Sequence, residues 1–423
     1  MAVFTESGDL LGIQRAQNIK YMRVLRWALR CIAAWPNQLT GHTNDTRFTK
    51  CFLSFTVLVT LVSGILFIKN NLDKLTFFEM GHNYITVFMN VVTVNRGFII
   101  FSKNYTETFT QFVNEIHLFN HRNKSPFFMK MHQQIHKLCH FFTMYMMAVM
   151  LWGLILFNLV PLYNTIANGA FIPSQENVTY ETSVNYAVPF DYQHNLLWFI
   201  VINIFNWYIS YVASTYFCVF DLLLALMMFH LWGHLKILIY NLENFPRPAP
   251  SCDPIYSQYK HYTFEELKHV RQQLKDIVVH HNLILKYTDD VSNSFGYSIA
   301  LSYAFHQVSC CVLLVECSQL DSKALIRYGP LTLILLQLLI QMSVIFELIN
   351  SLNQRLINAV YYLPWEYMDT SNRKSVIVIL RQVQIPMGLK ALGMVEVGCR
   401  TMVTILKTSI SYFIMLRTMA LKE

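Results

Sequence analysis

Five histidines come closest, by residue type and spacing, to a metal-binding pattern. His132, His136 and His140 recur at i, i+4 and i+8, and His280 directly precedes His281. A metal site needs convergent ligands of the right type, and the sequence offers none near either group. We therefore interpret these histidines as residues on solvated helix faces and predict no metal site.

The sequence carries no recognisable catalytic motif. It contains no G-x-S-x-G, H-E-x-x-H or P-loop pattern. Its nine cysteines are scattered rather than spaced as a framework, and the segment 161–195 contains none, so we interpret them as apolar packing residues. The sequence predicts a protein that is not an enzyme, uses no cofactor and binds no nucleic acid.

The C-terminal run "EVGCRTMVTILKTSISYFIMLRTMALKE" is apolar enough to cross a membrane but contains charged residues. A lysine near the bilayer centre costs ~2.5–3.5 kcal/mol on insertion scales. On a helix, the polar residues would form one stripe, which faces a water-filled path or the polar interior of a packed bundle. The packed interior is the commoner case, whereas several copies around one axis would line a pore. The stripe comprises Glu396, Arg400, Thr404, Lys407, Ser411, Met415 and Thr418.

The composition indicates an integral membrane protein. Hydrophobic residues make up 54% and charged residues 14% of the 423 positions, whereas a soluble domain carries about 25% charge. We predict an all-α fold with seven transmembrane helices of roughly twenty residues, and a polar, basic segment 1–47 before them. The predicted spans lie near 48–68, 78–101, 138–160, 196–220, 291–316, 328–350 and 391–416.

The distribution of basic residues predicts the orientation. With the N-terminus inside, 24 of the 33 Lys and Arg residues lie on the inner side, six on the outer side and three within spans, as the positive-inside rule favours. The C-terminus would then be outside. The sequon at Asn177 would lie in the outer loop 161–195 and be available for glycosylation.

Two helices are predicted to extend well beyond the membrane. The helical pattern runs from Leu196 to Leu242 and becomes amphipathic past His230, and the segment before the fifth span mirrors it. Their apolar faces need a partner, either each other in a hairpin or another subunit, and both remain open. A short amphipathic helix with Val376, Ile379, Leu380 and Val383 on its apolar side is expected before the last span.

Polar residues within the other spans are interpreted mainly as snorkelling or interhelical hydrogen-bonding groups. Arg96 and Asp221 both lie toward the inner ends of their spans and are placed to pair. The remaining residues of this kind are Glu79, Asn83, Asn90, Asn95, Gln337, Gln341 and Glu347.

The outer halves of spans two, three, four and six are rich in aromatic residues and methionine. Such residues suit a mostly apolar pocket for a small volatile or lipophilic ligand, although ordinary helix packing accounts for each of them as well. The candidate ligand-binding residues are Met80, Tyr84, Met146, Met150, Gly153, Phe157, Trp198, Phe205 and Tyr328.

Two stretches near the C-terminus resemble the signature of insect odorant receptors: "YYLPWEYMDTSNRKSVIVILRQVQIP" at 361–386 and "TILKTSISYFIML" at 404–416. The resemblance implies a subunit of a tetrameric, odorant-gated, non-selective cation channel in the plasma membrane of olfactory neuron dendrites, assembled with an odorant receptor co-receptor. The short break at about 245–263 favours the ligand-tuning subunit over the co-receptor.

The resemblance also assigns roles to segments. It implies a ligand-binding bundle within 48–228, a cytoplasmic anchor formed by 229–290 and 350–386, and a pore-lining helix at 391–419. The implied pore and gate residues are Lys407, Ser411, Met415, Thr418 and Met419.

Three other classes remain as alternatives. A gustatory-type channel would assemble without the co-receptor. A G-protein-coupled receptor would need the opposite orientation, and the chain lacks a DRY-like triplet and an NPxxY in its last span. A transporter would usually show broken helices or an inverted repeat, and neither is visible.

Overall fold

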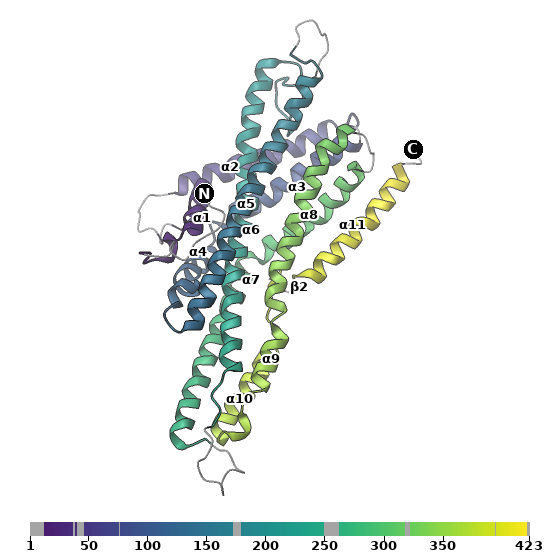
Figure 1. Cartoon of the computed structure of the whole chain (residues 1–423). Helices are drawn as coiled ribbons and strands as arrows, with labels where there is room; N and C mark the ends of the chain where they lie inside the picture. The colour runs from purple at the N-terminus through teal and green to yellow at the C-terminus, as the bar shows by residue number, and fades with distance from the viewer. Residues whose placement is uncertain are drawn as a thin grey trace.

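The structure, a computed structural model, is built almost entirely of helices (Figure 1). It describes residues 12–36, 39, 46–75, 77–171, 179–248, 262–317, 322–393 and 395–420. The helices are α1 (Lys20–Cys31), α2 (Arg47–Asn70), α3 (Phe77–Ile99), α4 (Lys103–Gln111), α5 (Pro126–Ala167), α6 (Leu196–Glu243), α7 (Phe264–Cys317), α8 (Ser322–Asn350), α9 (Asn353–Tyr361), α10 (Thr370–Val383) and α11 (Cys399–Ala420). The predicted all-α class is confirmed.

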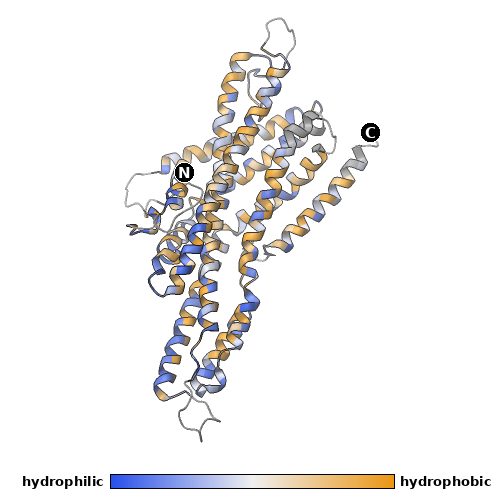
Figure 2. Cartoon of the chain, in the orientation of Figure 1, coloured by the Kyte–Doolittle hydropathy of each residue, from blue (hydrophilic) through white to orange (hydrophobic). Residues whose placement is uncertain are grey.

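Each of the seven predicted spans falls on a helix of its own, namely α2, α3, α5, α6, α7, α8 and α11. By length and composition, five helices of the described chain are apolar enough to cross a membrane, or six if the bent pair Met80–Ile99 and Lys103–His121 counts as one span. Hydrophobic residues dominate the upper helices in Figure 2, and hydrophilic residues gather at the lower ends of α7 and α10. These features are those of a multi-pass membrane protein.

Helix α6 is the centre of the bundle. It is 48 residues long, and the stretch from Thr215 to Leu231 is buried throughout, as expected for a helix that is hydrophobic on all sides. Its start is set by Asn195, whose side-chain oxygen accepts hydrogen bonds from the N–H groups of Leu197 and Trp198 at 3.0 and 3.4 Å.

Helices α6 and α7 continue well past the length of a membrane span, as predicted. α7 is 54 residues long and begins at a capping box, in which the Glu266 N–H donates to Thr263 Oγ1 and the Thr263 N–H donates to Glu266 Oε2. The extension of α6 is tied to α9 by Arg355, whose guanidinium makes two 2.9 Å hydrogen bonds to the Glu243 carboxylate. The apolar faces of both extensions find partners within the chain, since Leu235 and Ile239 of α6 and Leu274 of α7 are buried.

Helix α10 forms as the amphipathic pattern predicts. Val376, Ile379 and Val383 are buried, while Ile377 and Val378 remain exposed on the opposite side. The Asp369 carboxylate caps the helix by accepting a hydrogen bond from the Asn372 N–H at 3.3 Å.

The last span begins later than predicted. Residues 391–393 and 395–398 are not helical, and β1 (Lys390–Ala391) pairs antiparallel with β2 (Val395–Glu396). The hairpin rests on α7 at Gly296, where an added Cβ would lie 2.8 Å from the Lys390 carbonyl oxygen. Glu396 therefore belongs to β2 and not to the stripe on α11.

The interpretation of the histidines as solvated residues is wrong. His132, His136 and His140 are 0%, 4% and 2% exposed. They are covered by segments that are remote in sequence: the ring of Tyr21 on α1 lies 5.7 Å from that of His136, and the ring of Phe119 lies 5.6 Å from that of His132. Within the described residues, no group of three or more potential ligands is arranged to hold a metal ion.

Candidate ligand cavity and pore-lining helix

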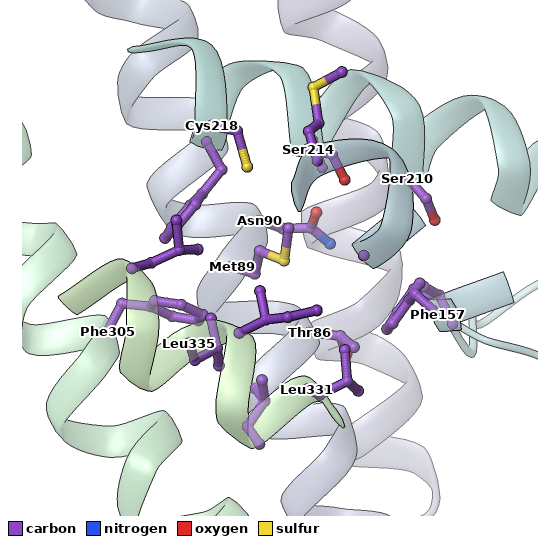
Figure 3. Close-up of a pocket in the computed structure, with 18 of the residues that line it drawn as sticks. Thr86, Met89, Asn90, Phe157, Ser210, Ser214, Cys218, Phe305, Leu331 and Leu335 are labelled. Atoms are coloured by element: carbon purple, nitrogen blue, oxygen red, sulfur yellow. The ribbon is translucent and has the colours of Figure 1, made fainter. Parts of the chain in front are cut away.

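A cavity of about 140 Å³ lies between α3, α5, α6, α7 and α8 (Figure 3). Its wall is mainly aliphatic, aromatic and sulfur-containing, and Val184 and Tyr186 of the segment before α6 also contribute. Cavities of ~150 Å³ lined by apolar side chains hold benzene-sized molecules, so this one has room for a small ring or a short chain. The lining comprises His82, Ile85, Thr86, Met89, Asn90, Val149, Met150, Gly153, Phe157, Val184, Tyr186, Ile209, Ser210, Ala213, Ser214, Phe217, Cys218, Phe305, Leu313, Leu331, Ile334, Leu335 and Leu338.

Three polar residues of the cavity wall have side chains without a hydrogen-bond partner among the described residues, namely Asn90, Ser214 and Tyr186 through its hydroxyl. The Asn90 amide and the Ser214 hydroxyl make no hydrogen bond to any other described residue, and Figure 3 shows Asn90 reaching into the middle of the space. By contrast, His82 Nε2 is engaged with the Ser183 carbonyl oxygen at 3.0 Å, and the Ser210 hydroxyl donates to Asn158 Oδ1 at 3.5 Å. The cavity therefore offers a ligand a hydrogen-bond donor and acceptor within an apolar wall.

The predicted ligand-binding residues are divided by the fold. Met150, Gly153 and Phe157 line the cavity. An added Cβ at Gly153 would lie 3.9 Å from Ile334 Cδ1, so the glycine leaves space between α5 and α8.

Met80, Tyr84, Met146, Trp198 and Phe205 lie outside the cavity wall. Tyr84 is 45% exposed on the opposite side of α3. Met146 is buried against Gln341, whose side-chain amide lies 2.9 Å from its sulfur. Trp198 stacks on Phe190 at 4.2 Å, and Phe205 packs on Tyr186 at 5.7 Å.

Tyr328 lies on α8, but its side chain is outside the described residues, as is the whole of Asn177. Their predicted roles as a ligand contact and a glycosylation site stay predictions.

Residues that sequence reasoning missed come mostly from α6, α7 and α8, among them Ser214, Phe305 and Leu335. From the sequence, Asn90 is predicted only to be an intramembrane polar group. Its position near the middle of a span, away from both ends where snorkelling is possible, was the one available sign of a functional role.

A buried ion pair lies next to the cavity, because the Arg96 guanidinium is 4.8 Å from the ring of Phe217 in the cavity wall. Arg96 on α3 is 2% exposed, and its Nη2 lies 2.7 Å from Asp221 Oδ1 on α6, which confirms the predicted pairing. The same guanidinium donates to the Tyr216 carbonyl oxygen at 3.0 Å and to Ser302 Oγ on α7 at 2.8 Å. Three helices are thus held together by one side chain.

The polar stripe on α11 is exposed in the isolated chain. Thr404, Lys407, Ser411, Met415 and Thr418 are all solvent-accessible, whereas the opposite face of α11 packs on α7 and α8. The side chain of Met419 is outside the described residues. Burial of the stripe inside the bundle of a single chain is therefore wrong.

Polar contacts fix both the N-terminus and the packed face of α11. Glu347 Oε2 on α8 accepts a hydrogen bond from the Cys399 N–H at 3.1 Å, a favourable place for a carboxylate at a helix N-terminus. Further along, Gln307 on α7 donates through Nε2 to Ser409 Oγ at 3.1 Å, and Ser409 is fully buried. Because Phe305 on the same turn of α7 lines the cavity, α7 connects the cavity wall to α11.

Comparisons with known proteins agree on one family. The model of the family described as 7tm Odorant receptor matches residues 76–410. "Putative odorant receptor 69a, isoform B" of Drosophila melanogaster is 23% identical over 157 residues, which are 36% of this chain and 38% of that protein. The match therefore spans less than two-fifths of that relative's length.

Two solved structures have a similar fold. The insect olfactory receptor OR5 from Machilis hrabei superimposes with a TM-score of 0.74 and 16% sequence identity, covering 94% of this chain and 97% of that one. The same receptor in complex with eugenol gives a TM-score of 0.74 at 15% identity, covering 95% and 100%. At this level of identity the likeness establishes a shared fold.

Proposed function

This chain belongs to the 7tm odorant receptor family, and on that premise we propose that it is the ligand-binding subunit of an odorant-gated, non-selective cation channel. The single observation that carries the proposal is the apolar cavity of about 140 Å³ with unpartnered polar side chains in its wall, among them Asn90 and Ser214. A relative of the same fold was solved in complex with eugenol. We infer that the odorant of this receptor is a small molecule with one hydroxyl or carbonyl group.

The proposed pore is lined by the exposed stripe of α11. A charged Lys407 facing lipid would cost ~2.5–3.5 kcal/mol, whereas water or a neighbouring subunit would accommodate it. The hydroxyls of Thr404, Ser411 and Thr418 donate to carbonyl oxygens of the preceding turn at 2.7–3.0 Å, so they present a moderately polar wall. Met415, Thr418 and Met419 form the proposed gate near the C-terminal end.

Gating follows from the connection between cavity and pore. An odorant that binds the open arrangement better than the closed one shifts the equilibrium toward the open pore. The hydrogen bond between Gln307 and Ser409 lies one turn or less from Phe305 in the cavity wall. A change in the packing of α7 at the cavity is therefore passed directly to the helix that lines the pore.

The proposed assembly is a tetramer with an odorant receptor co-receptor, oriented with the N-terminus inside and the C-terminus outside. The anchor would comprise 229–290 and 350–386, where Ile377 and Val378 are 65% and 68% exposed and lack a partner within this chain's described residues. The plasma membrane of olfactory neuron dendrites is the proposed location.

The deciding experiment is whole-cell current in cells that express this chain with or without an odorant receptor co-receptor, during perfusion of small volatiles. A cation current that needs both chains and the odorant supports the proposal. A response from this chain alone indicates a self-sufficient channel of the gustatory type. No current in either condition, with the protein detected at the cell surface, contradicts channel function.

A matched pair of variants tests whether the current passes along α11. Ser411→Cys on the stripe should make the current sensitive to a charged thiol reagent applied in the bath during odorant exposure. The control, Ser409→Cys, places the thiol on the buried face of the same helix and should leave the current insensitive. Equal sensitivity of the two variants would contradict the assignment of the stripe to the pore.

A further inference from the structure

Helix α1 presents a basic outer face that has a tryptophan at its centre. One side of α1 is buried against the bundle through Tyr21, Leu25 and Leu29. The other side carries Arg23, Arg26, Trp27 and Arg30, which fall within about 100° of one another at helical spacing. Trp27 is 57% exposed. We call these four residues the α1 basic face.

The arginines of this face have no acidic partner among the described residues. The described ion pairs involve neither Arg23, Arg26 nor Arg30, and α1 has no acidic residue in its first turn. Partial burial, and then the neighbouring charges of Arg30 and Arg23, lower the pKa of Arg26. Within the part of the chain that the structure describes, three cations thus lie close together without an acidic partner, an arrangement that an external anion would stabilise.

The end of α1 lies at the predicted inner surface of the membrane. The Ile32 carbonyl oxygen accepts a hydrogen bond from the Tyr216 hydroxyl at 3.4 Å, and Tyr216 is four residues from the predicted inner end of its span. At the same level, Lys50 at the start of α2 donates to the carbonyl oxygen of Ile100, just past the end of α3, at 3.4 Å.

The distance along α1 brings Trp27 to the headgroup layer. Trp27 precedes Ile32 by five residues, or about 7.5 Å of helix. The headgroup region extends roughly 5–8 Å beyond the hydrocarbon on each side. Because Tyr216 is about 6 Å inside the predicted end of its span, Trp27 lies at the start of this layer, where tryptophan is enriched. The long side chains of Arg26 and Arg30 extend toward the layer, where guanidinium groups bind phosphate with two parallel hydrogen bonds.

We propose that the α1 basic face is a binding site for the phosphate-bearing headgroup of an anionic phospholipid in the inner leaflet. The indole of Trp27 inserts between headgroups while Arg26 and Arg30 bind the phosphate and Arg23 adds long-range attraction. The bound lipid holds α1 against α5 and α6, where Tyr21 meets His230 and the Ile32 carbonyl oxygen meets Tyr216. The site depends on the N-inside orientation but not on channel activity.

Lipid retention by the purified full-length protein tests the site. Native mass spectrometry in detergent would be carried out with dioleoylphosphatidylserine, phosphatidylinositol 4,5-bisphosphate and dioleoylphosphatidylcholine in turn. We expect the two anionic lipids to bind and phosphatidylcholine not to bind. Preference for the bisphosphate over phosphatidylserine would identify a phosphoinositide site, and equal retention would identify a general anionic site.

Two triple variants test whether anionic lipid binds to the α1 basic face or to basic residues anywhere on the protein. Each near-surface basic residue contributes a factor of roughly five to anionic-lipid affinity, so Arg23→Gln with Arg26→Gln and Arg30→Gln should weaken binding at least tenfold. The matched control changes Lys268, Arg271 and Lys275 to Gln; these are exposed at helical spacing on α7, more than 15 residues before the predicted start of its span. Equal loss in both variants, or equal retention of phosphatidylcholine, overturns the proposal.

A second measurement does not depend on how the triple variant folds. Brominated phosphatidylserine quenches indole fluorescence on contact, and the part of the quenching that disappears in Trp27→Phe belongs to Trp27. We expect brominated phosphatidylserine to quench the fluorescence of Trp27, so that the total quenching is smaller in Trp27→Phe than in the unaltered protein. If Trp27 is not quenched, its surface is covered by something other than lipid, such as a neighbouring subunit, and the proposal is wrong. Neither readout uses odorant-gated current, so the result is independent of the proposed channel activity.

Discussion

In the proposed ligand cavity, Asn90 and Ser214 are unpartnered polar side chains within a mainly apolar wall. An apolar wall discriminates between ligands by shape, at ~1–3 kcal/mol per methylene. A buried polar group adds a stronger criterion, because a ligand that leaves it unpaired loses the hydrogen bond and still removes the water that had satisfied it. The amide of Asn90 can both donate and accept, which suits an alcohol, a phenol or a carbonyl compound.

Asn90→Leu should raise the half-maximal concentration for a hydroxyl- or carbonyl-bearing odorant by about tenfold or more, as expected for one buried hydrogen bond of ~1–3 kcal/mol. Responses to a hydrocarbon of the same shape should stay unchanged or improve. Dose-response curves of odorant-gated current measure both. Tyr84→Leu, on the exposed side of α3, serves as the control and should leave both curves in place. Equal shifts for the two kinds of odorant would contradict the role of Asn90.

Arg96 is a second single residue with a predicted effect, in this case on the stability of the fold. Arg96→Met leaves the buried Asp221 carboxylate without its 2.7 Å partner, and breaking a buried ion pair on one side costs ~3–5 kcal/mol. We expect a clear fall in the unfolding temperature of the purified protein and reduced surface expression. Adding Asp221→Leu should recover part of the loss, because no uncompensated charge then remains. A double variant as unstable as the sum of the single ones would show that the two residues act independently.

At the scale of elements, α1 is fastened to the bundle by a neutral hydrogen-bond network. The Leu118 N–H donates to His230 Nδ1 at 3.1 Å and the Phe119 N–H donates to His117 Nδ1 at 3.3 Å. Both rings therefore carry their hydrogen on Nε2, and both Nε2 atoms lie close to the Tyr21 hydroxyl oxygen, at 2.7 Å for His117 and 3.1 Å for His230. Protonation of either ring would break its bond to the backbone.

This network predicts a loss of stability in mild acid. Burial, followed by the nearby histidines, lowers the pKa of His117 and of His230 below the usual 6.5. The folded state then binds fewer protons than the unfolded state, so the free energy of unfolding falls as the pH drops below about 6.5. The ionisable groups that face these rings are Tyr21 on α1, His121 just before α5, His132, His136 and Cys139 on α5, and His234 on α6.

The unfolding temperature in detergent should therefore be constant from pH 8 to pH 7 and fall between pH 6.5 and pH 5.5. One histidine with a depressed pKa accounts for up to ~1.4 kcal/mol per pH unit, so His230→Gln should make the fall shallower. His269→Gln on the exposed surface of α7 should not. A fall of the same steepness in all three proteins would assign the acid sensitivity to other groups.

For the whole molecule, the exposed surfaces of α10 and α11 indicate that the single chain is an incomplete unit. α11 stands at the edge of the bundle with its polar stripe uncovered (Figure 1), and α10 exposes Ile377 and Val378 beside a well-packed inner side. Exposed apolar patches of this kind mark association surfaces. Assembly would cover both at once, with the anchor below and the pore at the centre.

Ile377→Asp combined with Val378→Asp should shift the purified protein from the oligomer toward the monomer, because two charges would be buried without partners at the interface. Light scattering coupled to size-exclusion chromatography measures the mass. Ser375→Asp, which adds a charge at an exposed polar position of the same helix, should leave the mass unchanged. An unaltered oligomer in the double variant would place the association surface elsewhere.

The sequence by itself predicts the features that depend on residues close together along the chain. Seven apolar runs predict seven helices because a span must satisfy its own backbone hydrogen bonds. The period of Val376, Ile379 and Val383 predicts α10 and its buried side, and the paired positions of Arg96 and Asp221 predict their contact. The family resemblance also rested on short continuous motifs.

Which side of each membrane helix faces inward required the folded chain. Tyr84 and Asn90 lie on opposite sides of α3, yet sequence reasoning favoured Tyr84 for ligand binding, and the cavity is at Asn90. In a membrane, both the lipid-facing surface and the interior are apolar, so hydropathy does not distinguish them. The burial of His132, His136 and His140 likewise depends on Tyr21 and Phe119. These partners lie in segments that are remote in sequence and come into contact only in the tertiary structure, so the local sequence pattern does not predict the contact.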